Sequence, residues 1–148
     1  MSQQFCTFHV GDLFLGIEVE RVQEVLRECD ITPVPTAPSA IRGLINLRGQ
    51  IVTAVDLRTR FAINERYEAP PTVLILDTDA ELLSLVVDRA GDVVEVEEAI
   101  FEEPPETLTG ESRRLIKGAY KLEKTLLLVL DVEHALAVGT TGVGDTPE

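Results

Sequence analysis

The side chains of this sequence that could do chemistry are two histidines, two cysteines and one short acidic run. A serine or cysteine nucleophile would need a histidine as its base. His9 falls on a predicted strand opposite Phe14, and His134 falls in a predicted closing helix. We therefore expect both to be ordinary, non-catalytic residues, with His9 at the surface. Cys6 and Cys29 lack metal-ligand spacing and predict no disulfide framework, so we expect two small buried hydrophobic residues.

The acidic run Asp77-x-Asp79-x-Glu81 looks like the start of a calcium loop but fails where such loops are strict. Its sixth position is Leu82 instead of glycine, and its twelfth is Asp88 instead of a bidentate glutamate. A solvated turn between two strands explains the run better. The sequence also contains no glycine-rich nucleotide loop and no HExxH motif. We predict no metal, no cofactor and no enzymatic activity.

The balance of charge limits the partners. The chain has 13 Lys and Arg residues against 26 Asp and Glu residues, a net charge of -13. Nucleic acids and anionic membranes attract clustered cations, so this composition argues against both. No apolar run reaches the ~18–20 residues that span a bilayer, and the first residues do not form a signal peptide. We expect a cytoplasmic protein.

Charge is also spread unevenly along the chain. Residues 77–111 contain 12 acidic residues and one basic residue, Arg89. Five arginines cluster between positions 42 and 66 in the first half, at Arg42, Arg48, Arg58, Arg60 and Arg66. We expect an acidic half and a locally basic arginine face, an arrangement that would help to orient a protein partner.

The elements that hold these residues are mostly strands. With 17 Val and 9 Ile residues and no Trp, the composition favours β structure. The clearest element is an N-terminal hairpin, because residues 13–20 alternate between apolar and polar after a Gly11-Asp12 pair suited to a type II′ turn. Pairing Val10 with Leu13 puts the apolar side chains of both strands on one face.

Further short strands are predicted at residues 42–47, 50–56, 72–76, 82–87, 115–122 and 125–130, with one more after a turn at Gly91-Asp92. Short helices are expected at 57–61 and 131–138, the second capped by Asp131. Residues 21–28 fit either a helix or a bent strand. The prolines between 33 and 38 predict an extended connection.

About ten short strands in two groups, divided at Pro70-Pro71, predict a mainly β fold of two small barrels, because barrels leave no exposed edges. The first barrel would take residues 4–68 and the second residues 71–130. The closing helix would follow at 131–138, and residues 139–148 would form a flexible tail.

The most distinctive residues lie between positions 22 and 58. They are Val22-Gln23-Glu24-Val25, Pro33-Val34-Pro35, Gly43-Leu44-Ile45-Asn46-Leu47-Arg48-Gly49 and Asp56-Leu57-Arg58. The two glycines, Gly43 and Gly49, predict positive φ or close backbone approach. Arg48 offers a planar cation at a turn, which suits a protein interface. Alternatively, Arg48 forms an internal ion pair with Asp56 or Glu24.

This stretch closely resembles the CheW-like domain family of chemotaxis coupling proteins. The family pattern runs through a V-x-EV segment, a P-V-P segment, G-[VLI]-INLRG and a DLR strand end. Further matches are Val86-Val87-Asp88, Ile116-Lys117-Gly118 and Leu130-Asp131. The resemblance covers about residues 4 to 136. It departs at Thr53-Ala54, where many members have a proline, and in a short N-terminal extension.

The resemblance implies a single domain over residues 1–138, built as two five-stranded, Src-homology-like barrels that share a hydrophobic core, with short helices. It implies a non-enzymatic adaptor between the cytoplasmic tips of chemoreceptors and the regulatory domain of the histidine kinase CheA, recruited to membrane arrays. A receptor-facing groove between the barrels would include Val22, Glu24, Gly43, Arg48, Gly49 and Gly118. The kinase-contact residues stay unassigned.

Two alternatives remain beside this interpretation. The chain could serve a chemosensory pathway that controls something other than flagella. It could instead be a barrel that binds a small molecule with its acidic half, which would require a pocket with convergent polar groups.

Overall fold

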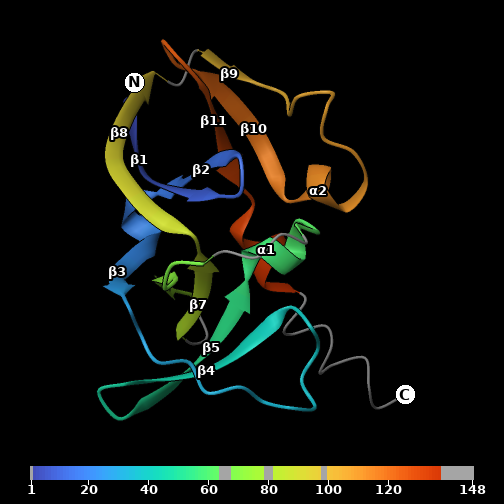
Figure 1. Cartoon of the computed structure of the whole chain (residues 1–148). Helices are drawn as coiled ribbons and strands as arrows, with labels where there is room; N and C mark the ends of the chain where they lie inside the picture. The colour runs from blue at the N-terminus through green and yellow to red at the C-terminus, as the bar shows by residue number, and fades with distance from the viewer. Residues whose placement is uncertain (1, 64–67, 79–81, 98–99, 138–148) are drawn as a thin grey trace.

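The computed structural model describes residues 2–63, 68–78, 82–97 and 100–137, and its chain forms two β-sheets (Figure 1). The six-stranded sheet, in the order β8-β1-β2-β11-β10-β9, consists of β1 (Ser2–Val10), β2 (Leu13–Glu18), β8 (Arg89–Glu97), β9 (Phe101–Glu102), β10 (Ile116–Lys121) and β11 (Leu126–Leu130). The five-stranded sheet, in the order β3-β6-β7-β5-β4, consists of β3 (Val22–Arg27), β4 (Ile41–Leu47), β5 (Gln50–Asp56), β6 (Thr72–Asp77) and β7 (Leu82–Val87). The predicted mainly β fold is confirmed.

The helical elements are short. They are a 3-10 turn (Val19–Arg21), α1 (Leu57–Arg60), α2 (Gly110–Arg114) and a closing helix at residues 132–137. The predicted cap is confirmed, because the His134 backbone N–H donates to the Asp131 carboxylate at 3.0 Å. Residues 138–148, and with them the predicted tail, lie outside the described residues. Within the described part of the chain, no helix is long and apolar enough to cross a membrane.

The N-terminal hairpin has the predicted register. Val10 pairs with Leu13, Phe8 with Leu15 and Cys6 with Ile17. Gly11 has a φ of 58°, as the first central position of a type II′ turn requires. The ambiguous segment at 21–28 is a strand, β3, entered from the 3-10 turn. Turn chemistry and apolar alternation agree here, which is why the local prediction succeeds.

The predicted division of the chain at Pro70-Pro71 is wrong. The five-stranded sheet takes residues 22–87, across both prolines, and the six-stranded sheet takes strands from both ends of the chain. Two parallel pairings, β2 with β11 and β5 with β7, join strands that are distant in sequence. The prolines break regular structure locally, but they do not decide which sheet the next strand joins.

The turn predicted at Gly91-Asp92 is also absent, since β8 continues through both residues without interruption. Gly91 lies where β1 passes closely, and a side chain there would collide with the Thr7 hydroxyl. The glycine therefore permits close strand packing at a bulge in the β1–β8 pairing. The chain instead changes sheets at Asp88, between β7 and β8.

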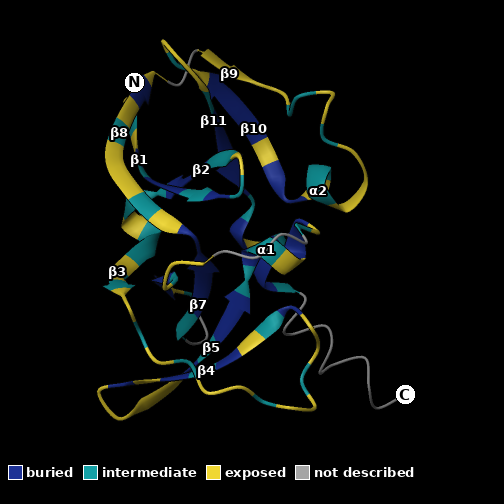
Figure 2. Ribbon diagram, in the orientation of Figure 1, coloured by how far each residue is buried: buried dark blue, intermediate teal, exposed yellow. Residues whose placement is uncertain are grey.

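Several strands are buried on both faces, which accounts for their uninterrupted apolar sequence (Figure 2). In β6, Val73 and Ile75 pack inside the curl of the five-stranded sheet, whereas Leu74 and Leu76 pack in a core shared by both sheets. In β11, Leu127 and Val129 line the interior of the six-stranded sheet, and Leu128 and Leu130 enter the shared core. The expected shared hydrophobic core is therefore present between the sheets.

A buried ion pair holds the crossing between the sheets. Arg58, at the start of α1, donates to both carboxylate oxygens of Asp88, from Nε to Oδ1 at 2.7 Å and from Nη2 to Oδ2 at 2.8 Å. The Asp88 side chain is 7% exposed, and its Oδ2 also accepts the Gly11 backbone N–H at 2.8 Å. One carboxylate thus joins α1, the β7–β8 crossing and the β1–β2 turn.

A second arginine fixes the closing helix. Arg60 is buried and donates to the backbone carbonyls of His134 at 2.7 Å and Ala135 at 3.1 Å. It also donates to the Glu111 carboxylate of α2 at 3.1 Å. Because carbonyls near a helix C-terminus have no partner within the helix, this contact satisfies them and ties the closing helix to α1 and α2.

We predict that Asp88→Ala lowers the free energy of unfolding by about 3–5 kcal/mol, because it leaves the Arg58 guanidinium enclosed without its counter-charge. Denaturant titration measures this change. The control is Arg42→Ala, which removes a partly exposed ion pair to Asp56 at 3.2 Å and should cost at most about 1 kcal/mol. Equal losses in the two variants would contradict the role given to Asp88.

Candidate functional site

The turn between β4 and β5 is built to present Arg48. Arg48 and Gly49 have φ values of 51° and 89°, so both central residues adopt the positive φ of a type I′ turn. The Gly49 backbone N–H donates to the Asn46 side-chain oxygen at 2.8 Å, which stabilises the turn. The prediction of a positive φ at Gly49 is confirmed. The Arg48 side chain is 66% exposed at this tip.

Arg48 forms an ion pair with Glu24, one of the two internal pairings that the sequence left as the alternative to an interface role. Its Nη2 donates to Oε1 of Glu24 at 2.6 Å and its Nη1 to Oε2 at 3.3 Å. The geometry is bidentate, the form in which an arginine–carboxylate pair is most specific. Asp56, the other proposed partner, instead pairs with Arg42 at 3.2 Å. The two residues singled out from the sequence therefore contact each other.

The ion pair spans two strands at opposite ends of the sheet order. Glu24 belongs to β3 and Arg48 follows β4, so the five-stranded sheet curls until its edges meet. A backbone bridge makes the same connection, because the N–H groups of Thr32 and Leu44 each donate to the other's carbonyl, at 2.9 and 2.8 Å. We call these four residues, Glu24, Thr32, Leu44 and Arg48, the edge junction.

Gly43 is what lets the edge junction form. A side chain at Gly43 would collide with the backbone carbonyl of Thr32 and with the Ile31 side chain. The prediction of close backbone approach at this glycine is confirmed. Gly43 is therefore needed for the fold, because only a residue without a side chain lets Thr32 and Leu44 pair and the five-stranded sheet curl.

The surroundings of the edge junction combine exposed apolar and paired polar groups. Val25, next to Glu24, is 37% exposed, and Ile51, three residues after Arg48, is 62% exposed. Apolar side chains around a satisfied arginine are typical of protein-binding surfaces. Among the described residues, no group of three or more His, Cys, Asp or Glu side chains could hold a metal ion. Val25 and Ile51 are exposed on β3 and β5, the strands that adjoin the edge junction, which the sequence alone does not indicate.

The remaining predicted site residues are placed differently. Val22 begins β3, is partly buried and packs against the shared core. Gly118 lies in β10 of the other sheet, where a side chain would collide with the Phe101 ring. The structure thus brings Glu24, Gly43, Arg48 and Gly49 together in one sheet, with Val22 at its border, and leaves Gly118 apart.

The arginine face expected from the sequence is neutralised by ion pairs. Four of its arginines have carboxylate partners: Arg42–Asp56, Arg48–Glu24, Arg58–Asp88 and Arg60–Glu111. The fifth, Arg66, lies outside the described residues. The prediction of a basic face is therefore wrong, because acids distant in sequence fold against these arginines.

The histidines and cysteines occupy separate places. His9 packs against Phe14 with ring centroids 5.0 Å apart and is half-buried, deeper than the predicted surface position. Partial burial lowers the pKa of His9. His134 Nε2 lies 3.1 Å from the Glu111 carboxylate. Cys6 and Cys29 are free thiols of intermediate exposure, so the prediction that both are buried is wrong.

We predict that Gly43→Ala opens the edge junction, since the added methyl group must displace the Thr32 carbonyl. Hydrogen exchange should show loss of protection at the Thr32 and Leu44 amides. Gly49→Ala is the control, because it also places a side chain at positive φ, at a cost of about 1 kcal/mol, but meets open space. Retained protection in Gly43→Ala would exclude the proposed role of Gly43.

The hydrogen bond from Arg48 lowers the pKa of the Glu24 carboxyl below its ordinary value of 4.5. A lowered folded-state pKa means that the pair stabilises the fold above pH 4.5 and that this contribution is lost as the pH falls through the lower value. We predict that Arg48→Gln returns the pKa of Glu24 to the ordinary range. A carbon-detected NMR titration of Glu24 measures it, and an unchanged pKa would show that the pair does not persist in solution.

Comparison with known proteins agrees with this architecture. The family model described as "CheW-like domain" matches residues 4–139. A Treponema pallidum protein named "Chemotaxis protein CheW" is 30% identical over 134 residues, covering 87% of this chain and 79% of that protein. A Klebsiella aerogenes protein of the same name is 29% identical and covers 93% of this chain and 83% of its own length.

A solved structure has the same fold. The scaffolding protein TtCheW from Thermoanaerobacter tengcongensis superimposes with a TM-score of 0.85 at 26% identity, covering 96% of this chain and 97% of that chain. The matched region includes both sheets and the edge junction. On this evidence the chain belongs to the CheW-like domain family.

Proposed function

We propose that this chain is a coupling adaptor of chemotaxis signalling, which joins the cytoplasmic tips of chemoreceptors to the regulatory domain of the histidine kinase CheA. The observation that carries the proposal is the exposed, bidentate Glu24–Arg48 pair, flanked by exposed apolar side chains, on the family's most specific motif. The adaptor acts in the cytoplasm, at receptor arrays, by holding proteins in a fixed geometry and not by making or breaking bonds.

The edge junction suits a helical partner for a physical reason. A receptor hairpin would lay an apolar stripe on Val25 and Ile51, and its polar groups would meet the ion pair. A guanidinium has five N–H donors, and two of them are directed at Glu24, which leaves donors for partner oxygens. The carboxylate holds Arg48 in one orientation, so less side-chain entropy is lost when the partner binds.

The proposed receptor surface comprises Val22, Glu24, Gly43, Arg48 and Gly49. Glu24 and Arg48 set the register of the partner, and Gly43 and Gly49 shape the backbone that presents them. Val22 supports β3 from the shared core. Gly118, assigned to the same groove by resemblance, would act indirectly if at all, since it seats an aromatic ring in the other sheet.

We predict that Arg48→Ala and Glu24→Ala leave folding intact but weaken association with a receptor hairpin by about 1–3 kcal/mol, as interface anchors do. A pull-down with a receptor cytoplasmic hairpin measures the loss. Arg42→Ala is the matched control, because Arg42 is an exposed, ion-paired arginine of β4, the strand that precedes Arg48. Wild-type binding by both test variants would mean that the receptor binds elsewhere.

The coupling role itself requires two partners at once. In sedimentation assays with the receptor hairpin and the kinase regulatory domain, the chain should bind each alone and should also carry the kinase domain into the receptor fraction. The Arg48→Ala variant should lose the receptor and keep the kinase domain. Mutually exclusive binding of the two partners would overturn the adaptor proposal while leaving the family assignment untouched.

A further inference from the structure

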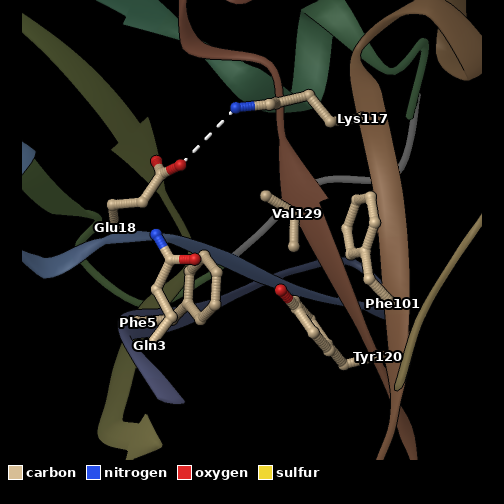
Figure 3. A pocket seen from close by; sticks show the side chains of 7 residues that line it. All are labelled: Gln3, Phe5, Glu18, Phe101, Lys117, Tyr120 and Val129. Atoms are coloured by element: carbon tan, nitrogen blue, oxygen red, sulfur yellow. Dashed lines mark hydrogen bonds and ion pairs between the residues drawn. The ribbon is translucent and has the colours of Figure 1, made fainter. Parts of the chain in front are cut away.

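The six-stranded sheet holds a pocket that lies apart from the edge junction. Its volume is about 360 Å³, and it is lined by Gln3, Phe5, Glu18, Phe101, Lys117, Tyr120 and Val129 (Figure 3). These residues come from β1, β9, β10 and β11 and from the end of β2. The pocket therefore lies on the six-stranded sheet and draws on five of its six strands.

Aromatic rings form its walls. The centroid of the Tyr120 ring lies 5.5 Å from that of Phe5 and 5.0 Å from that of Phe101. Phe5 and Tyr120 are buried, whereas Phe101 is 43% exposed. Figure 3 shows the Tyr120 hydroxyl pointing toward the centre of the pocket, with the Phe101 ring on one side and the Phe5 ring on the other. Phe101 therefore offers an exposed ring face to a ligand, whereas Phe5 and Tyr120 form the buried floor beneath it.

The position of the Phe101 ring depends on the absence of a side chain at Gly118. Any side chain at Gly118 would overlap the Phe101 ring, so the glycine of the Ile116-Lys117-Gly118 motif makes the seat for this wall. The preceding residue of the motif, Lys117, lines the same pocket. The Ile116-Lys117-Gly118 motif contributes nothing to the edge junction. It supplies this pocket with the Lys117 side chain and with the space that the Phe101 ring occupies.

Charge at the rim indicates the ligand. Of the seven lining residues, Glu18 and Lys117 are charged, and they form a long ion pair, with Nζ and Oε2 3.5 Å apart. The Lys117 side chain is 46% exposed and the Glu18 side chain 17% exposed. Lys117 can therefore move into solvent at little cost, whereas the less exposed Glu18 carboxylate stays at the pocket.

We propose that this pocket binds a small organic cation, an ammonium group carried on an apolar or aromatic body. The ammonium group would replace Lys117 beside Glu18, and the body would lie against the exposed Phe101 ring, next to the Tyr120 hydroxyl. Aromatic faces attract cations within about 6 Å of the ring centroid. The net charge of -13 favours the approach of cations over anions. This inference does not depend on the proposed receptor surface, because the pocket and the edge junction lie on different sheets.

Three probes of similar size and different charge test the proposal. They are 2-phenylethylamine, 2-phenylethanol and 3-phenylpropanoate, each titrated into the full chain and followed by amide NMR shifts. We expect the amine to bind at least tenfold more tightly than the other two and to shift the amides of Phe101, Lys117 and Tyr120. Binding that is tightest for the carboxylate, or shifts that fall outside the pocket, would overturn it.

Substitutions add a sharper test. Glu18→Gln should weaken amine binding at least tenfold, and Lys117→Met should strengthen it by removing the competing ammonium group. Lys121→Met, an equal loss of charge on the same strand outside the pocket lining, should change nothing. If Lys117→Met and Lys121→Met give the same affinity, Lys117 does not guard the site and the proposal fails. Receptor pull-down by the Glu18→Gln variant should stay at wild-type strength, which separates this result from the coupling role.

Discussion

A single carboxylate, that of Asp88, fixes the point at which the chain passes from one sheet to the other. Each sheet has an apolar face that only the other sheet can cover, so the crossing must be held in one geometry. Arg58 holds it through two hydrogen bonds, and the Gly11 backbone adds a third. Charged groups so deeply enclosed are stable only when fully paired, which makes the crossing an all-or-none arrangement.

Local order was predictable from the sequence, whereas the partners of the strands were not. Alternation and the Gly11 turn were sufficient for the first hairpin, because its partner strand is adjacent. The apolar runs at 73–76 and 127–130 were identified as strands, but burial on both faces removes the periodicity that would indicate which side meets which sheet. The prolines at 70–71 then suggested a boundary that long-range pairing overrides.

The candidate site was predicted in its residues but not in its geometry. Glu24 and Arg48 stand out by type and spacing, yet their contact depends on the curl of the whole sheet, which no local pattern contains. The prediction grouped Gly118 with these residues, although it lies in the other sheet. Its neighbour Phe101 belongs to a two-residue strand, too short to leave a periodic signal, so the aromatic wall and the pocket behind it were invisible in the sequence.

The parallel pairing of β2 with β11 has a consequence for biosynthesis. Leu15, in the first hairpin, is made early, but its neighbour Leu128 leaves the ribosome only near the end of translation. Until then the hairpin carries an uncovered apolar face, although all five strands of the other sheet have already been made. Distant pairing of this kind slows folding and favours aggregation. We therefore expect the nascent chain to engage cellular chaperones before the last strand is complete.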